Sequence, residues 1–278
     1  MEDRFVFRVA IGASIVWLVW FFHPSLAERM MVHWNGEKVG QWGDSFGALN
    51  ALMSTLAFAA VLYTLRLQQR QIDDAQRDQH IQRFESSYFE LLRLFREARA
   101  AIKFEYGLEY RKSKGYASNP STNIIRVGRA MALNPQTAQR QGDEAFRAAM
   151  IEFRYWMQSG GVVGKSNINL LAEIYTKRIH DRYEGQFGPY FRLMYTILQR
   201  ISEDDKLSPN EKARYGNLLR SQISSYEAAI AGFNGLSPVS KDFSRLITEF
   251  RLLKYLPSGT TRRVLERHYP PEAFNARD

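Results

Sequence analysis

The 278-residue chain contains no cysteine, and this absence excludes two classes of site. Neither a disulfide framework nor a metal centre built on thiolates can form without cysteine. The chain also has only five histidines, and none of them lies in the His-Glu-x-x-His spacing of a zinc hydrolase. The Gly-x-Ser-x-Gly pattern occurs once, at residues 43–47, directly before an apolar helical segment rather than after a strand, so it is not a nucleophile elbow. We therefore expect no bound metal, no cofactor and no classical hydrolase chemistry.

A long gap in charge sets one segment apart from the rest of the chain. Charged residues make up 24% of the sequence, yet none occurs between Phe46 and Leu65. A helix over residues 46–67 is long enough to cross a hydrocarbon core of roughly 30 Å. It also lacks the charged face of a soluble amphipathic helix. We predict that this segment spans a membrane.

A second apolar run lies nearer the N-terminus. Residues 5–22 contain one charged residue, Arg8, and end in aromatic residues, which collect at membrane interfaces. We predict two spanning helices, 5–22 and 46–67, joined by a short external loop over residues 23–44. Together they form a membrane anchor, residues 1–67. Two buried helices of a soluble protein are the alternative.

The distribution of basic residues predicts the orientation of this anchor. The external loop carries a net charge of −1, whereas the second span is followed by Arg66, Arg70, Arg77 and Arg83. Basic segments stay in the cytoplasm, so both termini are expected there. The whole chain has a formal net charge of +9, and nearly all of the excess lies after the loop. A basic cytoplasmic domain suits anionic lipid, nucleic acid or an acidic protein partner.

The chain after the anchor shows helical periodicity and no convincing strand, which predicts an all-α fold. Residues 68–106 are expected to form a helical stalk and the first domain helix, with apolar side chains at three- and four-residue steps. Residues 107–141 are expected to form a basic loop, and residues 142–278 a cytoplasmic helical domain. The predicted helices of that domain cover residues 143–158, 166–183, 208–233, 240–256 and 261–268, and one more begins at Gly188-Pro189.

The basic loop is a candidate binding surface. Between Tyr110 and Gln141 it contains six basic residues and no acidic one. We expect a basic surface for anionic lipid or nucleic acid, and its residues are Lys112, Lys114, Arg126 and Arg129.

A second basic group lies near the C-terminus. Arg262 or Arg263, together with His268, has the Arg-x(4–6)-His spacing found in all-α HEPN ribonucleases. In such a site, His would transfer the proton and Arg would stabilise the charge on the phosphate. A solvated basic helix is the alternative interpretation.

The most unusual stretch runs from Arg214 to Ser237. If it forms one helix, four polar residues fall on one face at about 100° per residue: Arg220, Ser224, Glu227 and Asn234. This polar stripe is either a structural feature, solvated or tied to another helix by an ion pair, or a partly buried recognition or switch site. We expect Arg192, on the preceding helix, to be the partner of Glu227.

The same region carries a family pattern. Residues 188–201 contain Tyr-Phe-Arg followed by Tyr, residues 214–237 contain Arg-x-Gln-x-Ser-x-x-Glu followed by Asn, and residues 241–256 contain Phe-x-x-Leu-Ile. In order and spacing these motifs resemble the phage abortive infection (AbiC-like) family of membrane proteins, and the resemblance extends upstream to Asp44. Phe250 stands where the family usually has Tyr, and Asp143 where it has Arg. The binding or switch candidates on these motifs are Arg192, Tyr195, Arg220, Gln222, Ser224, Glu227 and Asn234.

The resemblance implies a bacterial inner-membrane protein of antiphage defence, without implying a particular reaction. We expect a non-enzymatic sensor or effector that acts through its cytoplasmic helical domain. A membrane-tethered ribonuclease is one alternative, and a scaffold that binds anionic lipid or nucleic acid is another. The expected partners are the lipid bilayer and a phage-encoded protein or another defence protein, with a second copy of the chain as a further candidate.

Overall fold

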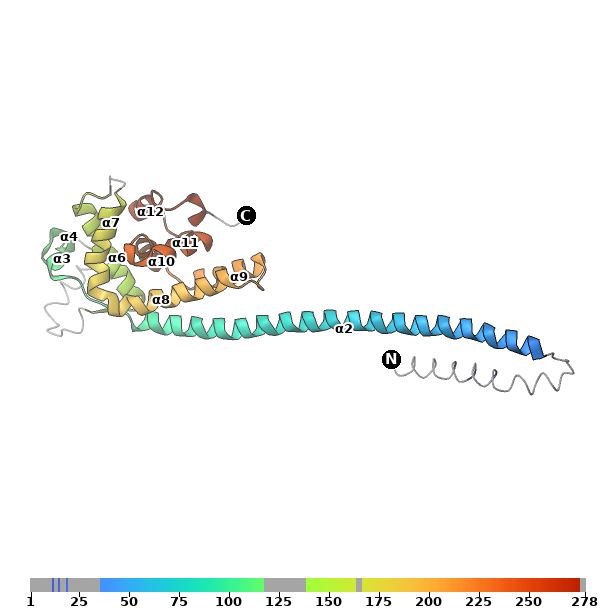
Figure 1. The fold of residues 1–278 in the computed structure, drawn as a ribbon. Coiled ribbons are helices and arrows are strands. Elements are labelled where there is room, and N and C mark those ends of the chain that lie inside the picture. Colours follow the sequence, from blue (N-terminus) through green and yellow to red (C-terminus); the bar gives the residue numbers. More distant parts are fainter. Residues whose placement is uncertain are drawn as a thin grey trace. The chain divides into compact units, whose positions relative to one another are not determined.

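The structure, a computed structural model, describes residues 12, 15, 19, 36–117, 139–163 and 167–275. The chain divides into two compact units, Met1–Ala75 and Gln76–Asp278. Helices dominate the described parts of the chain (Figure 1), which confirms the prediction of an all-α fold. Within those parts, the one departure is a short antiparallel ladder between β1 (Lys103–Phe104) and β2 (Arg140–Gln141).

The helix α2 (Gly36–Ala101) is continuous over 66 residues. The helix begins before Phe46, where the second predicted span starts. Residues 36–44 of the predicted external loop are therefore helical, and no proline interrupts the helix there. Among the described residues, α2 is the one helix whose length and composition would allow it to cross a membrane. The first predicted span lies outside the described residues apart from three isolated positions, and the two-span prediction is not confirmed.

The apolar segment of α2 is exposed along its whole described length. Every side chain from Asn50 to Gln79 is exposed, and Phe58 is 64% exposed. The polar groups in this segment are satisfied within the helix: the hydroxyls of Thr55 and Thr64 each donate to a backbone carbonyl of the preceding turn, at 2.8 Å. Satisfied hydroxyls cost little in an apolar medium, so these two threonines would not oppose insertion of the segment into a bilayer.

Within the second unit, the C-terminal part of α2 packs into the core through one face. Its buried side chains are Phe84, Tyr88, Leu92 and Phe95, which confirms the prediction from their three- and four-residue spacing. The helix ends at Ala101, before the predicted end near Glu105, because the chain there passes into β1.

The rest of the domain is a set of packed helices connected by short turns. The longer helices are α6 (Asp143–Ser159), α7 (Ile168–Tyr175), α8 (Asp181–Glu203), α9 (Pro209–Arg220), α10 (Ser225–Gly235), α11 (Lys241–Glu249) and α12 (Thr260–Leu265). The shorter elements are α3 (Leu108–Lys112), α4 (Lys114–Ala117), the π-helical turn η2 (Thr176–His180), and the 3₁₀ turns η3 (Pro238–Ser240) and η4 (Pro271–Ala273).

The central helix of this domain is α10. Every residue from Glu227 to Gly235 is buried. The helix packs against α6, α7, α11 and α12, which lie around it in Figure 1. A helix that is covered on every side belongs to the core. A charged side chain on α10 therefore needs partners from neighbouring elements.

The predicted helix over residues 208–233 is two helices. A capping box formed by Ser208 and Glu211 begins α9 at the predicted start, but this helix ends at Arg220. A second capping box, formed by Ser224 and Glu227, then begins α10. The Ser-x-x-Glu pattern of a capping box is present at both positions, so the break is encoded locally.

Three other helix boundaries differ from the prediction. The helix expected from Ser166 has Asn167 as its N-cap, whose side chain accepts from the backbone N–H of Leu170. The Gly188-Pro189 pair lies inside α8, and the break falls earlier, at Tyr183, with φ −133° and ψ 22°. The helix expected to reach residue 256 ends at Glu249, and Arg251, two residues later, has a positive φ of 52°.

Candidate functional site

The most strongly buried acidic group with partners from several elements is Glu227. Its side chain is completely buried at the start of α10, where it completes the capping box. Its carboxylate accepts a hydrogen bond from the backbone N–H of Ser224 at 2.6 Å. It also accepts one from the hydroxyl of Tyr190, on α8, at 2.7 Å. The carboxylate therefore connects α8 to the first turn of α10.

The cation nearest to this carboxylate comes from α2. The Nη1 atom of Arg99 lies 3.7 Å from Oε2 of Glu227 and donates to the carbonyl of Gln222 at 2.6 Å. The Arg99 side chain is 24% exposed, whereas that of Glu227 is fully buried. The same arginine thus neutralises the buried charge and holds the turn between α9 and α10. We call Arg99, Tyr190, Ser224 and Glu227 the buried carboxylate network.

The environment of this network perturbs the pKa values of its acids. Burial raises the pKa of Glu227 above its ordinary value, and the opposing hydrogen bonds from Ser224 and Tyr190 and the charge of Arg99 only partly offset it. Burial, together with the adjacent carboxylate, raises the pKa of Tyr190 well above its ordinary value, so its hydroxyl stays protonated and donates. The network therefore holds a charge that is expensive to bury and that depends on two hydrogen-bond donors and one nearby cation.

The predicted partner of Glu227 was wrong. Arg192 forms an ion pair with Glu184 at 2.8 Å, and its side chain is 67% exposed. Glu184 precedes Arg192 by two helical turns on α8, so this pair forms on the surface of one helix. The buried carboxylate is reached instead from α2, because the end of that helix lies next to the turn before α10.

The predicted polar stripe is also divided between two helices. Arg220 ends α9, where it is 5% exposed and donates to the carbonyl of Phe250 and to Asn217. These bonds tie the end of α9 to the end of α11. Gln222 lies in the turn between α9 and α10, and its backbone carbonyl accepts the hydrogen bond from Arg99. Arg220 therefore contributes to the fold, separately from the buried carboxylate network.

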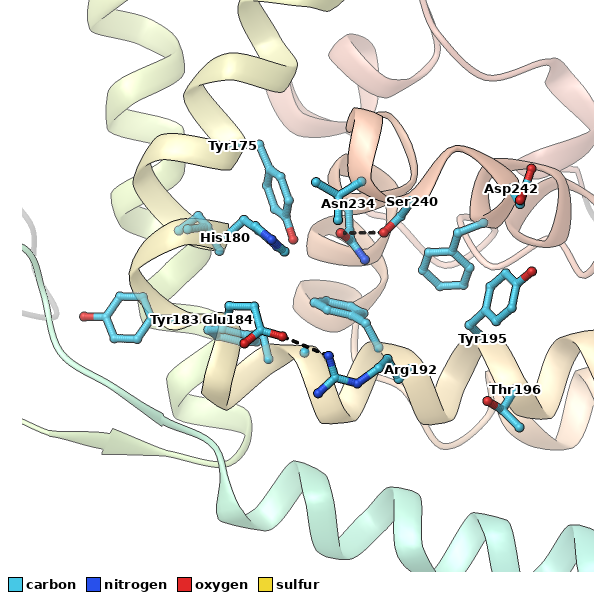
Figure 2. Close-up of a pocket in the computed structure, with 16 residues that line it drawn as sticks. Tyr175, His180, Tyr183, Glu184, Arg192, Tyr195, Thr196, Asn234, Ser240 and Asp242 are labelled. Carbon is cyan, nitrogen blue, oxygen red and sulfur yellow. Dashed lines mark hydrogen bonds and ion pairs between the residues drawn. The ribbon is translucent and has the colours of Figure 1, made fainter.

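A cavity of about 520 Å³ lies elsewhere in the same unit, and none of the four network residues lines it. It is lined by residues of α7, η2, α8, α10, η3 and α11 (Figure 2). Three of the predicted site residues line it: Arg192, Tyr195 and Asn234. Its volume falls in the usual range for small-molecule sites, about 300–1,000 Å³. The structure thus brings together part of the predicted site, although at a cavity that the sequence did not reveal.

The deepest polar groups of this cavity are Asn234 and Tyr175. Asn234 is 4% exposed, and its Oδ1 accepts a hydrogen bond from the hydroxyl of Ser240 at 3.4 Å. Tyr175 is 1% exposed, and burial raises the pKa of its hydroxyl, which stays protonated. Figure 2 shows Oδ1 of Asn234 joined to Ser240 by a dashed line, with Tyr175 and His180 among the other residues that line the cavity.

The mouth of the cavity is formed by the Glu184–Arg192 ion pair. The two side chains meet across Gly188, where an added Cβ would lie 2.6 Å from Oε1 of Glu184 and 3.1 Å from Nη1 of Arg192. The absence of a side chain at Gly188 therefore lets the pair close over the helix. Glycine is needed here for close approach, since the helix itself does not require it.

The predicted ribonuclease group does not assemble. Arg262 forms an ion pair with Glu266 at 2.7 Å and donates to the carbonyl of Leu256 at 2.9 Å. Arg263 is exposed on the same helix. His268 lines a different, shallow cavity with Arg245. Burial and the charge of the neighbouring arginine lower the pKa of His268.

The predicted basic surface is described only in part. Lys112, at the end of α3, and Lys114, at the start of α4, are exposed. Arg126 and Arg129 lie outside the described residues. The surface therefore stays a prediction.

Three residues of the site were missed by sequence reasoning. Arg99 lies on α2 and Tyr175 on α7, and nothing in their local sequence marks them. Tyr190 stands within the family pattern, next to residues that were named as candidates. The signal that was available for Glu227 is the capping box, which predicts a helix start at Ser225 rather than a polar stripe.

One comparison with known proteins gives a match. Residues 182–261 match the family model described as "putative phage abortive infection protein". No curated protein and no solved structure gives a match. The matched segment runs from the start of α8 to the start of α12 and contains Tyr190, Glu227 and Asn234, whereas Arg99 and Tyr175 lie outside it. Residues 182–261 of this chain are thus similar to the phage abortive infection family, and this match supports a role in antiphage defence.

Proposed function

We propose that this chain is a membrane-anchored antiphage protein that receives a phage-made signal in its helical domain and acts on the membrane through α2. The observation that carries this proposal is the double role of α2. The helix contains the exposed apolar segment that begins before Asn50, and it also contains Arg99, whose guanidinium neutralises the buried Glu227. One element thus contains both an apolar sequence that would face lipid and the arginine that neutralises a fully buried carboxylate.

The buried carboxylate network supplies a physical route for the signal. Glu227 has partners on α2 and α8 and in its own cap, and each partner offsets part of the cost of burying the charge. A change in the packing of α8 against α10 would alter these contacts and the hold of Arg99 on the turn before α10. A ligand can shift such an equilibrium only by binding one arrangement better than the other. The signal is therefore expected to bind next to α8 and α10.

The expected topology follows from the sequence. Arg66, Arg70, Arg77 and Arg83 after the apolar segment favour a cytoplasmic location for the helical domain, where it would meet a phage-encoded protein or another phage-made molecule. The exposed apolar side chains of α2 would contact the bilayer or a second copy of the chain. These partners belong to the proposal.

The experiment that tests this function is a phage challenge of bacteria that carry the gene. Survival, membrane potential and RNA integrity should be followed in the same culture. We expect infected cells to lose membrane potential before any loss of RNA, and cells without the gene to show no such early change. RNA degradation at constant membrane potential would contradict the proposal and favour a tethered ribonuclease. Recovery of the full-length protein in the soluble fraction without detergent would exclude the anchor.

A further inference from the structure

Two polar side chains that line the cavity between α8, α10 and α11, Asn234 and Tyr175, each have a donor group with no hydrogen-bond acceptor within the described part of the chain. Oδ1 of Asn234 accepts from the Ser240 hydroxyl, which leaves the amide Nδ2 as the end of this side chain that can bind a ligand. The Tyr175 hydroxyl has no hydrogen bond to any described residue, and the residue as a whole is 1% exposed. Both side chains line the cavity (Figure 2).

These two groups are donors toward a ligand. The amide Nδ2 of Asn234 can only donate. The Tyr175 hydroxyl stays protonated and has no acceptor among the described residues, so its proton is available. The buried floor of the cavity thus calls for a ligand with two hydrogen-bond acceptors.

The walls of the cavity are aromatic. The rings of Phe187 and Phe191 are stacked with centroids 6.3 Å apart, and Phe243 lies 6.4 Å from Phe191 and 6.2 Å from Tyr195. All four residues line the cavity, as does Tyr183. Aromatic faces favour stacking with a planar ring. The shape and the walls therefore suit a flat heteroaromatic molecule better than a flexible chain.

The charges at the mouth disfavour an anionic ligand. Arg192 is already paired with Glu184, and Asp242 adds a second carboxylate to the lining. Apart from His180, the lining carries one arginine against two carboxylates. A phosphate would have to compete with Glu184 for Arg192 and would also meet the repulsion of Asp242. A neutral ligand has no such penalty.

We propose that this cavity is a binding site for a neutral, planar heteroaromatic molecule with two hydrogen-bond acceptors on one edge, the chemistry of a nucleobase or nucleoside. Guanine presents N7 and O6 as neighbouring acceptors on one edge, whereas adenine replaces the second acceptor with an amino donor. The donors of Asn234 and Tyr175 therefore favour guanosine over adenosine. The site deepens the proposed function, because the use of this ligand as a signal rests on that function, whereas binding itself does not.

The test is calorimetric titration of the full-length chain, purified in a mild detergent, with guanosine, adenosine and guanosine 5′-monophosphate. We expect guanosine to bind more tightly than both of the others. Failure of guanosine to bind, or tighter binding of adenosine or of the monophosphate, would overturn the proposal.

Two variants and a matched control separate binding from folding. Tyr175→Phe should weaken guanosine binding about tenfold, the effect of one neutral hydrogen bond, with no loss of melting temperature. Asn234→Asp, which turns the donor into an acceptor, should weaken it further. The control is Tyr88→Phe, because the Tyr88 hydroxyl donates to the carbonyl of Tyr215 at 2.7 Å, far from the cavity. This control should lower the melting temperature and leave the affinity unchanged. Unchanged affinity in Tyr175→Phe would contradict the proposal.

Phage protection then distinguishes the site from the proposed function. If Asn234→Asp abolishes both guanosine binding and protection, the site and its signalling role are both supported. If it abolishes binding but leaves protection intact, the binding site stands and the signalling role is rejected. If wild-type cells are protected although guanosine does not bind, the site is rejected and the proposed function survives.

Discussion

The loss of stability caused by replacing Arg99 should depend on whether Glu227 is still charged, because the two side chains belong to the same buried carboxylate network. The informative set of variants is Glu227→Gln, Arg99→Met, the double variant, and Arg192→Met as a control. Glutamine keeps the size of the side chain at Glu227 but has one acceptor oxygen for the two donors that now reach the carboxylate, the Ser224 N–H and the Tyr190 hydroxyl. Methionine removes the charge at position 99 and keeps most of the apolar stem.

The expected costs follow from the contacts. In Glu227→Gln one buried donor loses its acceptor, which costs about 1–3 kcal/mol. The variant no longer buries a charge, and this gain offsets part of the cost. We therefore expect the free energy of unfolding to fall by about 1–2 kcal/mol. In Arg99→Met the carboxylate keeps its charge without a cation, a change that costs about 3–5 kcal/mol in a fully buried pair. The 24% exposure of Arg99 and the 3.7 Å separation place the cost at the lower end, about 3 kcal/mol.

The double variant should cost less than the two single variants added together. Once Glu227 is neutral, Arg99→Met removes mainly the hydrogen bond to the carbonyl of Gln222, at about 1 kcal/mol. The expected coupling is therefore about 2 kcal/mol, within the range of about 0.5–3 kcal/mol for residues in contact. Arg192→Met combined with Glu227→Gln should be additive within about 0.5 kcal/mol, because Arg192 is paired with Glu184.

The assay is denaturant unfolding of each variant beside phage protection in cells. Ser208→Ala provides a matched stability control, because it removes the other capping box at a cost of about 1 kcal/mol and lies outside the network. If the network transmits a signal, Glu227→Gln should lose protection while Ser208→Ala keeps it. Additive costs for Arg99 and Glu227 would refute the energetic reasoning. Equal protection in Glu227→Gln and Ser208→Ala would make the network purely structural.

Further measurements test the electrostatics, the topology and the basic surface. Burial raises the pKa of Asp204, but hydrogen bonds from His80 and the backbone outweigh this effect and leave the pKa below its ordinary value of 3.8. A lowered pKa stabilises the folded state above pH 3.8. The stability that the wild type has in excess of Asp204→Asn should therefore disappear as the pH falls through the folded-state pKa. A reporter at the C-terminus should be cytoplasmic and one near Asn35 periplasmic, and the reverse pattern would overturn the predicted orientation. Replacing Lys112 and Lys114 with Gln should weaken binding to anionic vesicles about 30-fold at low salt, at about 1 kcal/mol per residue, and equal binding to neutral vesicles would count against the surface.

Local patterns in the sequence were enough for most of the helices. The spacing of Phe84, Tyr88 and Leu92 predicted the buried face of α2, because a helix places residues three and four apart on one side. The capping box at Ser208 predicted the start of α9, because its hydrogen bonds form within one turn. The gap in charge after Phe46 identified the segment whose composition suits a bilayer. Each of these properties depends on residues close together in the chain.

Local patterns also permitted one wrong interpretation. Residues 214–237 fit a single helix with a polar stripe, and they also contain the Ser-x-x-Glu of a second capping box at Ser224 and Glu227. Both readings satisfy helical periodicity. The fold selects the second one, because burial of α10 on all sides requires the chain to turn after Arg220, and Glu227 then serves both as a capping residue and as a partner of other helices.

Only the tertiary structure decided which side chains meet. The sequence predicted Arg192, on the preceding helix, as the partner of Glu227, yet the packing of helices brings Arg99 to it from far along the chain. The cavity is a similar case, since Tyr175 and Asn234 come from different helices and carry no common motif. The physical reason is that a helix determines which residues share its own face, whereas the packing of several helices around α10 determines which faces come together.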